Sequence, residues 1–228
     1  MSTKEGEKMT KTVRQIFFEG LGTYVLLLAI VGSGIMAKNL TDDIALALLI
    51  NATAIVATLF VLISVLANLS GAYFNPAVVL YVLIRKKMSI ELGIYLVLAQ
   101  FIGGFLGVIT ANYIFDNPVI SIASNDRFSL PAFFGEIIAT AGLIFIISKK
   151  KKLLPEASIE TVVSLWIFGA IFFTSSTAFA NPAVTVSRIL TDSFTGISPI
   201  SALWFVVAEV IAVGLVYLLN IATKIKRK

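Results

Sequence analysis

The sequence contains no cysteine and no histidine, and only 14 % of its 228 residues are charged. Without cysteine the chain forms no disulfide and has no thiol chemistry. Without histidine it lacks the commonest general base, a common metal ligand and the side chain that titrates near neutral pH. We therefore expect no enzyme activity, no metal site and no cofactor. With 58 % hydrophobic residues the composition indicates a membrane protein, because about a quarter of the residues in soluble domains are charged.

Lysine and arginine outnumber aspartate and glutamate by 18 to 13, which gives the chain a net charge of +5. Most of the basic residues lie beside apolar stretches, at 4–14, 85–87, 149–152 and 224–228. Basic residues in such places mark the cytoplasmic side of a membrane protein and contact anionic lipid headgroups. We therefore expect a multi-pass protein of the plasma membrane with both termini in the cytoplasm. Its partner is then the lipid bilayer and not a nucleic acid.

Six apolar stretches have about the 20 residues that are needed to cross a hydrocarbon core of about 30 Å. Their approximate limits are 13–37, 44–67, 90–114, 129–148, 159–173 and 200–221. Two shorter apolar segments, 75–83 and 181–190, lie between these stretches and are too short to cross a membrane.

Each short segment begins with the same four residues, Asn-Pro-Ala-Val, at 75–78 and at 181–184. Proline donates no backbone hydrogen bond and pushes the residue before it out of helical geometry, so a helix does not continue through it. Asparagine is a good N-cap and proline suits the first helical turn, which predicts half-helices that start at Asn75 and Asn181. Such breaks occur at membrane depth only where protein or a water-filled cavity covers them.

The motifs that flank the two strings also repeat. A Glu-x-x-x-Thr that starts at Glu19 recurs at Glu136, and Ala-Gln at 99–100 corresponds to Ala-Glu at 208–209. Each half holds three spans, an odd number, so the second half must be inverted in the membrane. The sequence thus predicts an all-α membrane protein with six transmembrane helices, two re-entrant half-helices and an inverted two-fold repeat. We expect one channel domain over residues 1–228, with repeats at about 13–114 and 129–222.

The paired strings, the residues before them at 70–74 and 179–180, and the repeated glutamate motifs resemble the aquaporin (major intrinsic protein) family. The resemblance implies a homotetramer with one passive pore per subunit for water or small neutral solutes. It places six residues at the pore centre: Asn75, Pro76, Ala77, Asn181, Pro182 and Ala183. It also implies that Glu19 and Glu136 support the re-entrant loops, although buried acids would suit a proton relay as well. Two facing half-helix N-termini carry partial positive charge, which opposes cations at the centre.

The outer constriction departs from the pattern of water-selective members of that family. Those members have an arginine directly after the second Asn-Pro-Ala, where this chain has Val184. Family spacing assigns the other filter positions to Ile55, Gly169 and Ala178. This apolar set predicts a wide filter without its arginine and with weaker rejection of cations. Arg188 lies one helical turn beyond Val184, where it either reaches back toward the filter or stays at the outer rim.

Residues 174–177 and 184–188 resemble a prokaryotic, aquaglyceroporin-like subgroup of the family that is associated with arsenic resistance. The resemblance implies a passive channel for arsenite, glycerol-like polyols and water. A strict water channel, with Arg188 completing the filter, is one alternative. A secondary transporter is another, because inverted repeats with broken helices occur in transporters too. It would need Glu19, Glu136 or Glu209 to bind the coupling ion or relay a proton.

Overall fold

The structure, a computed structural model, describes residues 3–153 and 155–225, with side chains described for residues 9–149 and 155–223. The described chain contains helices and no strand. The helices are α1 (Thr3–Leu40), α2 (Ile44–Leu66), α3 (Pro76–Ile84), α4 (Ile90–Ile114), α5 (Leu130–Leu153), α6 (Ile159–Phe173), α7 (Pro182–Ser187), the 3-10 turn η1 (Arg188–Leu190) and α8 (Pro199–Ile225).

Five of these helices, α1, α2, α4, α5 and α8, are long and apolar enough to cross a membrane. The sixth expected span, α6, is apolar but has only 15 residues. The turn that follows α6 extends its reach, because Ser175 Oγ donates to the carbonyl of Pro131 (2.8 Å) in the first turn of α5. From there the chain turns back toward Asn181 and α7. The predicted limits of the other spans hold to within a few residues, except that α1, α5 and α8 continue into the neighbouring basic segments.

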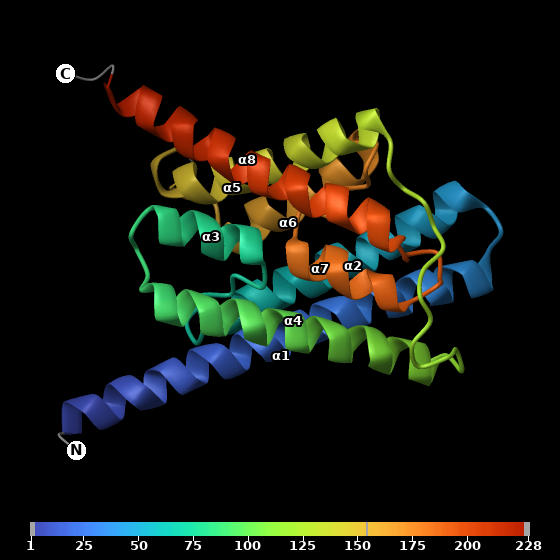
Figure 1. Ribbon diagram of the computed structural model, residues 1–228, viewed down its shortest axis with the longest axis horizontal. Helices are drawn as coiled ribbons and strands as arrows, with labels where there is room; N and C mark the ends of the chain where they lie inside the picture. Colours follow the sequence, from blue (N-terminus) through green and yellow to red (C-terminus); the bar gives the residue numbers. More distant parts are fainter. Residues whose placement is uncertain (1–2, 154, 226–228) are drawn as a thin grey trace.

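The two halves of the chain have the same order of elements, with α1 to α4 in the first half and α5 to α8 in the second. In the first half α1 packs against α2 and α4, and in the second α5 packs against α6 and α8. The half-helices α3 and α7 lie nearly end to end at the centre of the bundle (Figure 1). Each also contacts the last span of the other half, α3 with α8 and α7 with α4. The predicted all-helical fold with an inverted repeat is confirmed.

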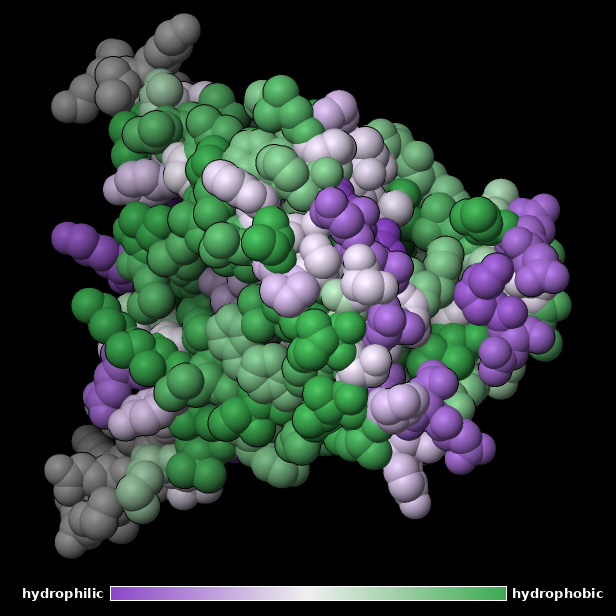
Figure 2. Space-filling view, turned by 45° about the vertical axis from the view of Figure 1, so that its right-hand side comes forward, coloured by the Kyte–Doolittle hydropathy of each residue, from purple (hydrophilic) through white to green (hydrophobic). Residues whose placement is uncertain are grey.

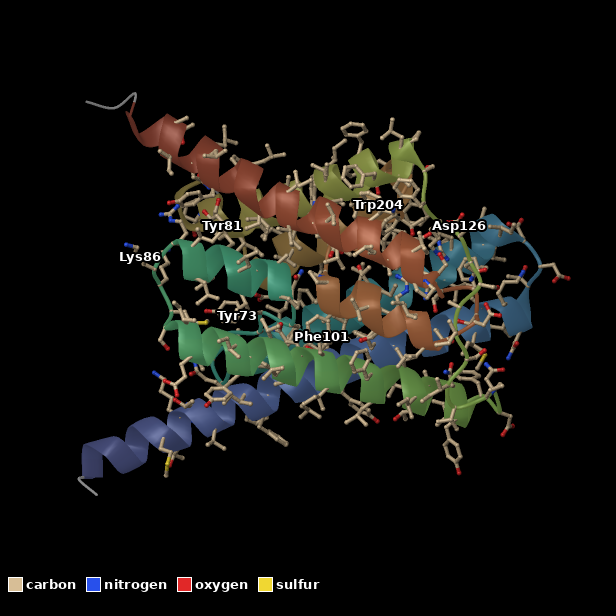
Figure 3. The ribbon with its side chains drawn as sticks, in the orientation of Figure 1. Tyr73, Tyr81, Lys86, Phe101, Asp126 and Trp204 are labelled. Atoms are coloured by element: carbon tan, nitrogen blue, oxygen red, sulfur yellow. The ribbon has the colours of Figure 1, made fainter. Side chains whose placement is uncertain are left out.

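The bundle has two chemically different ends. Both termini and the α3–α4 connection lie at one, the termini end, and the α1–α2 and α4–α5 connections lie at the other, the loop end (Figure 1). Lys86 lies at the termini end and Asp126 at the loop end (Figure 3). On the face shown in Figure 2, a band of hydrophobic side chains covers most of the surface between the two ends. On α4 this band includes Ile94, Leu98 and Ile102, each more than half exposed, as expected of a helix that faces lipid or another subunit.

Glycines allow α1 and α4 to pack with their backbones almost in contact. A Cβ atom added at Gly103 would lie 2.0 Å from the carbonyl oxygen of Gly20, and one at Gly107 would lie 2.3 Å from that of Tyr24. Small residues permit such close approach between membrane helices. The close packing brings the side chain of Gln100 on α4 within hydrogen-bond distance of Glu19 on α1 (2.8 Å).

Candidate channel site

Asn75 and Asn181 cap the two half-helices at the centre of the molecule. Both have extended backbone geometry, and Pro76 and Pro182 follow them at the first helical positions. The side-chain oxygen of Asn75 accepts a hydrogen bond from Ala77 N–H (2.9 Å), and that of Asn181 accepts one from the N–H two residues further on (3.0 Å). Each cap uses only the amide oxygen, so the amide nitrogen stays available for other partners.

The two asparagines also tie the half-helices to each other. Asn75 Nδ2 donates to the carbonyl of Ala180 (2.7 Å), and Asn181 Nδ2 donates to the carbonyl of Phe74 (2.7 Å). The bonds are reciprocal, since each asparagine contacts the residue just before its counterpart. Each amide nitrogen has two hydrogens, so each retains one donor after this bond. The arrangement fixes two N–H donors and two helix N-termini at one point of the bundle.

The loops that lead into the half-helices share an uncommon backbone conformation. Gly71, Ala72 and Phe74 have φ of 104°, 49° and 47° before Asn75. Residues 177, 178 and 180 have φ of 61°, 51° and 48° at the corresponding places before Asn181. Residues other than glycine enter this left-handed region only when their surroundings hold them there. The agreement between the loops shows that the repeat extends to single backbone angles.

Glu19 holds the first loop by accepting four hydrogen bonds in a completely buried position. Its Oε1 accepts from Ser70 Oγ (2.9 Å) and Tyr73 N–H (2.9 Å). Its Oε2 accepts from Phe74 N–H (2.7 Å) and Gln100 Nε2 (2.8 Å). With both oxygens used twice, the carboxylate satisfies donors that would otherwise be buried without partners.

Two buried glutamates have the same task in the second loop. Glu136 accepts hydrogen bonds from the N–H groups of Phe179 (3.2 Å) and Ala180. Glu209, which stands where the first half has Gln100, accepts from Asn181 N–H (2.8 Å) and Thr185 Oγ1 (2.7 Å). Neither these residues nor Glu19 line the cavity described next. A coupling ion or a proton relay needs carboxylates that face the pathway, so their placement favours support of the loops.

A cavity of about 340 Å³ runs between the helices and past both asparagines. On α2 it is lined from Ile44, the first residue of the helix at the loop end, to Ala67, just after the last. It therefore extends along the whole length of a membrane-spanning helix. Hydrophobic side chains of α1, α2, α5 and α6 form most of its wall, while the polar lining includes Asn51, Asn75 and Asn181. No acidic side chain lines it within the described part of the chain.

Four of the five residues expected in the filter line this cavity: Ile55, Ala178, Val184 and Arg188. Gly169 is not among the lining residues, and a Cβ atom added there would contact only the ring of Phe173, at 3.6 Å. The face of α6 toward the cavity carries four hydrophobic residues at a spacing of four: Ile159, Val163, Ile167 and Ile171.

Arg188 does not lie at an outer rim in solvent. Its side chain is 7 % exposed and lines the cavity, with its Cζ only 3.6 Å from the centre of the Phe179 ring. Its Nε donates to the carbonyl of Thr195. The valine at position 184 therefore does not leave the cavity without an arginine. An arginine reaches it from one helical turn further along.

A second arginine in the cavity lining was not expected from the sequence. Arg127, in the connection between α4 and α5, donates through Nε and Nη2 to the carbonyls of Gly196 and Phe194 (both 2.7 Å). Its Cζ lies 5.6 Å from the centre of the Phe179 ring. Burial lowers the pKa of Arg127 from its ordinary value, but arginine remains protonated at neutral pH. No local pattern around residue 127 signals this role, because the position depends on how a long connection folds over the bundle.

These features define a class of protein. A membrane-spanning bundle with a cavity along its length, two facing half-helices at its centre and no acidic side chain in the described cavity lining is a transmembrane channel for uncharged solutes.

Comparison with known proteins gives the family. The model of the major intrinsic protein family matches residues 7–178, and the chain belongs to this family. The chain is 40 % identical over 198 residues to the aquaglyceroporin AqpS of Rhizobium meliloti (strain 1021), which covers 87 % of this chain and 84 % of that protein. A probable TIP-type aquaporin of Medicago truncatula is 31 % identical over 140 residues, 60 % of this chain and 56 % of that one. The crystal structure of the aquaglyceroporin from Plasmodium falciparum superimposes with a TM-score of 0.69 at 25 % identity, over 90 % of this chain and 93 % of its own. The protein is a channel and not an enzyme.

Proposed function

We propose that this channel passively conducts glycerol-like polyols and arsenite, as well as water, through the cavity between α2 and the two half-helices. The observation that carries the proposal is the continuity of the cavity, which is lined from one end of α2 to the other and passes both Asn75 and Asn181. A closed structural protein has no need of such a passage. The similarity to an aquaglyceroporin over most of the chain supports polyols as one class of solute.

The chemistry of the lining supports neutral hydroxylated solutes. A polyol has hydroxyl groups that accept from the free N–H donors of Asn75 and Asn181, and a carbon skeleton that contacts the apolar wall. Arsenite is an uncharged trihydroxy species at neutral pH, so it meets the same requirements. A cation meets two positive half-helix ends, and no carboxylate in the described lining replaces its hydration shell.

We propose that the narrow filter is formed by Ile55, Ala178, Val184 and Arg188, with Ile171 of α6 in the position first assigned to Gly169. Support comes from the shared lining of one cavity by these residues and from the burial of Arg188. Weaker rejection of cations stays a prediction, which the positive charge of Arg188 in the cavity lining opposes. An arginine in the filter also keeps the strict water channel as the second candidate function.

The assembly and orientation are proposals as well. The exposed hydrophobic band suits contacts with lipid and with three further copies in a homotetramer, which the resemblance to the aquaporin family implies. The basic groups at 85–87 and 149–152 flank the termini end, so we propose that this end faces the cytoplasm of a cell whose plasma membrane holds the channel.

Stopped-flow light scattering on proteoliposomes tests the function. Water efflux is compared with re-swelling in glycerol and in arsenite, at zero ion gradient. The proposal predicts re-swelling in both solutes well above empty liposomes and without saturation. Fast water efflux without re-swelling would leave the strict water channel as the function.

Val184→Arg tests the proposed filter. A second guanidinium beside Arg188 should narrow the passage, and it should reduce glycerol and arsenite flux by at least tenfold more than water flux. Equal loss of all three fluxes in folded protein would count against Val184 as a filter residue.

A further inference from the structure

The loop end of the cavity holds two guanidinium groups that have no acidic partner. Arg127 and Arg188 both line the cavity, and neither forms an ion pair with a described residue. The two acids nearest in sequence are engaged elsewhere: Asp126 accepts from Ser201 Oγ (2.6 Å), and Asp192 accepts from the backbone and side chain of residue 124 (2.9 Å each). Arg188 is buried and Arg127 is half-buried, and such positive charges without a carboxylate partner are uncommon in proteins.

Backbone carbonyls hold both arginine side chains in place but leave some of their N–H donors without an acceptor. They engage three successive carbonyls of residues 194–196 through Nε of both side chains and Nη2 of Arg127. Both Nη groups of Arg188 and Nη1 of Arg127 have no hydrogen-bond acceptor among the described residues. Glu136 acts on Arg188 electrostatically, but its oxygens accept from the N–H groups of the second loop.

The two guanidiniums lie beside the same aromatic ring and donate to neighbouring carbonyls of residues 194–196, which places them within reach of one ligand. Their Cζ atoms lie 3.6 Å and 5.6 Å from the centre of the same Phe179 ring, so the distance between them is at most the sum of these values. A tetrahedral oxyanion can span two guanidiniums at such a separation, because each guanidinium binds oxygen atoms about 2.8 Å from its nitrogens. Arginine is also the residue whose planar donor fork best fits phosphate-like and carboxylate groups.

We propose that the loop end of the channel contains a binding site for a small oxyanion of the sulfate or phosphate type, held between Arg127 and Arg188. A bound oxyanion occupies the mouth of the passage and obstructs neutral solutes. It does not travel further, because the cavity beyond it is walled mainly by isoleucine, leucine and valine, where a charged group loses its hydration. A lipid headgroup is not the ligand, since Arg188 is buried inside the bundle, away from the lipid-facing surface.

Isothermal titration calorimetry of the purified full-length protein with sulfate tests the binding. Gluconate keeps the ionic strength constant, and sulfate remains a dianion over the working pH range. We expect one sulfate per chain, with affinity at least tenfold weaker in Arg127→Gln and in Arg188→Gln. Arg85→Gln is the matched control and should bind within threefold of the unmodified protein, because Arg85 contacts Tyr81 at the termini end (3.2 Å). Arg127→Lys keeps the charge and should retain more affinity than Arg127→Gln, which separates loss of charge from misfolding.

The obstruction rests on the proposed channel function, so it has its own measurement. Glycerol re-swelling is recorded with and without external sulfate. The rate with sulfate is divided by the rate without it, and this ratio is compared among the same variants. We expect the ratio to fall in the unmodified protein and to stay near one in Arg127→Gln. No sulfate binding, or equal binding in both glutamine variants and the unmodified protein, would overturn the site. Binding without any change of glycerol flux would overturn the obstruction, and absence of glycerol flux altogether would instead overturn the channel function.

Discussion

Replacing Glu19 by glutamine should reveal how much the first re-entrant loop depends on one carboxylate. Glutamine keeps a single acceptor oxygen, which can still accept from Ser70 and Tyr73 in the place of Oε1. Its NH₂ group then faces two donors, Phe74 N–H and Gln100 Nε2. The side-chain amide of Gln100 can rotate, because its Oε1 is buried without a partner. After the rotation this oxygen accepts from the NH₂ group of the new glutamine. Phe74 N–H is then left unsatisfied, and the NH₂ group of Gln100 moves to the place of an oxygen that had no hydrogen-bond partner.

The expected cost follows from this count. A buried N–H without a partner destabilises by about 1–3 kcal/mol, and Glu19→Gln should cost at least about that much. Glu19→Ala removes the acceptor of all four donors, of which Ser70 Oγ has another at 3.5 Å, the carbonyl of Leu66, and it should cost at least about 2 kcal/mol more. The loop contains residues with positive φ, including Phe74 at 47°, that relax once they are released. Since the carbonyl of Phe74 accepts from Asn181, relaxation should also reduce glycerol flux.

Apparent Tm in detergent and glycerol re-swelling in liposomes measure these effects. Both Tm and flux should fall in the order unmodified protein, Glu19→Gln, Glu19→Ala. Glu91→Gln is the control, because Glu91 is exposed at the start of α4. If Glu19→Ala had the Tm and flux of the unmodified protein, the support role of Glu19 would be refuted.

Three further predictions test other parts of the structure. Gly103→Ala should separate α1 from α4 and cost about 1–3 kcal/mol, whereas Gly214→Ala, with no atom within 4 Å of the new Cβ, should leave apparent Tm unchanged or raised. Ile171→Trp should reduce glycerol flux at least tenfold and Gly169→Trp much less, because only Ile171 lines the cavity; the reverse order in liposomes would restore the first filter assignment. The backbone and hydroxyl donors of residue 124 lower the pKa of Asp192 from its ordinary value, so this contact stabilises the loop end above about pH 4. The contact should be lost as pH falls through the lowered pKa, and the protection factor of the amide of residue 124, followed by hydrogen exchange, should fall there and not change in Asp192→Asn.

The fold was predictable because membrane spans obey a simple physical requirement. Apolar stretches of about 20 residues, broken by Asn-Pro pairs, define both the spanning helices and the half-helices without any tertiary information. The limits 90–114 and 159–173 coincide with α4 and α6. The helix α6 is shorter than a full span, and the turn around Ser175 covers the remaining distance to the first turn of α5. No hydropathy pattern describes such a turn.

The site was predictable only where it depends on local sequence. The caps at Asn75 and Asn181 follow from residue type and spacing. The filter position on α6 does not, because counting back from Asn181 assumes a fixed conformation for the loop between them, and Ile171 faces the cavity where Gly169 does not. Arg127 is the strongest example. It reaches the cavity through hydrogen bonds to residues about 70 positions away in sequence, which only the folded chain brings together.

The most direct test of the central claim uses the absence of cysteine from the chain. A single cysteine is introduced at Val184, in the cavity wall, and glycerol flux is recorded before and after a methanethiosulfonate reagent. Leu165→Cys, on the outward face of α6 with 62 % exposure, is the control. If neutral solutes pass through this cavity, the reagent should stop glycerol flux in Val184→Cys, a reductant should restore it, and the control should not respond. Unchanged flux in fully labelled Val184→Cys would contradict the account.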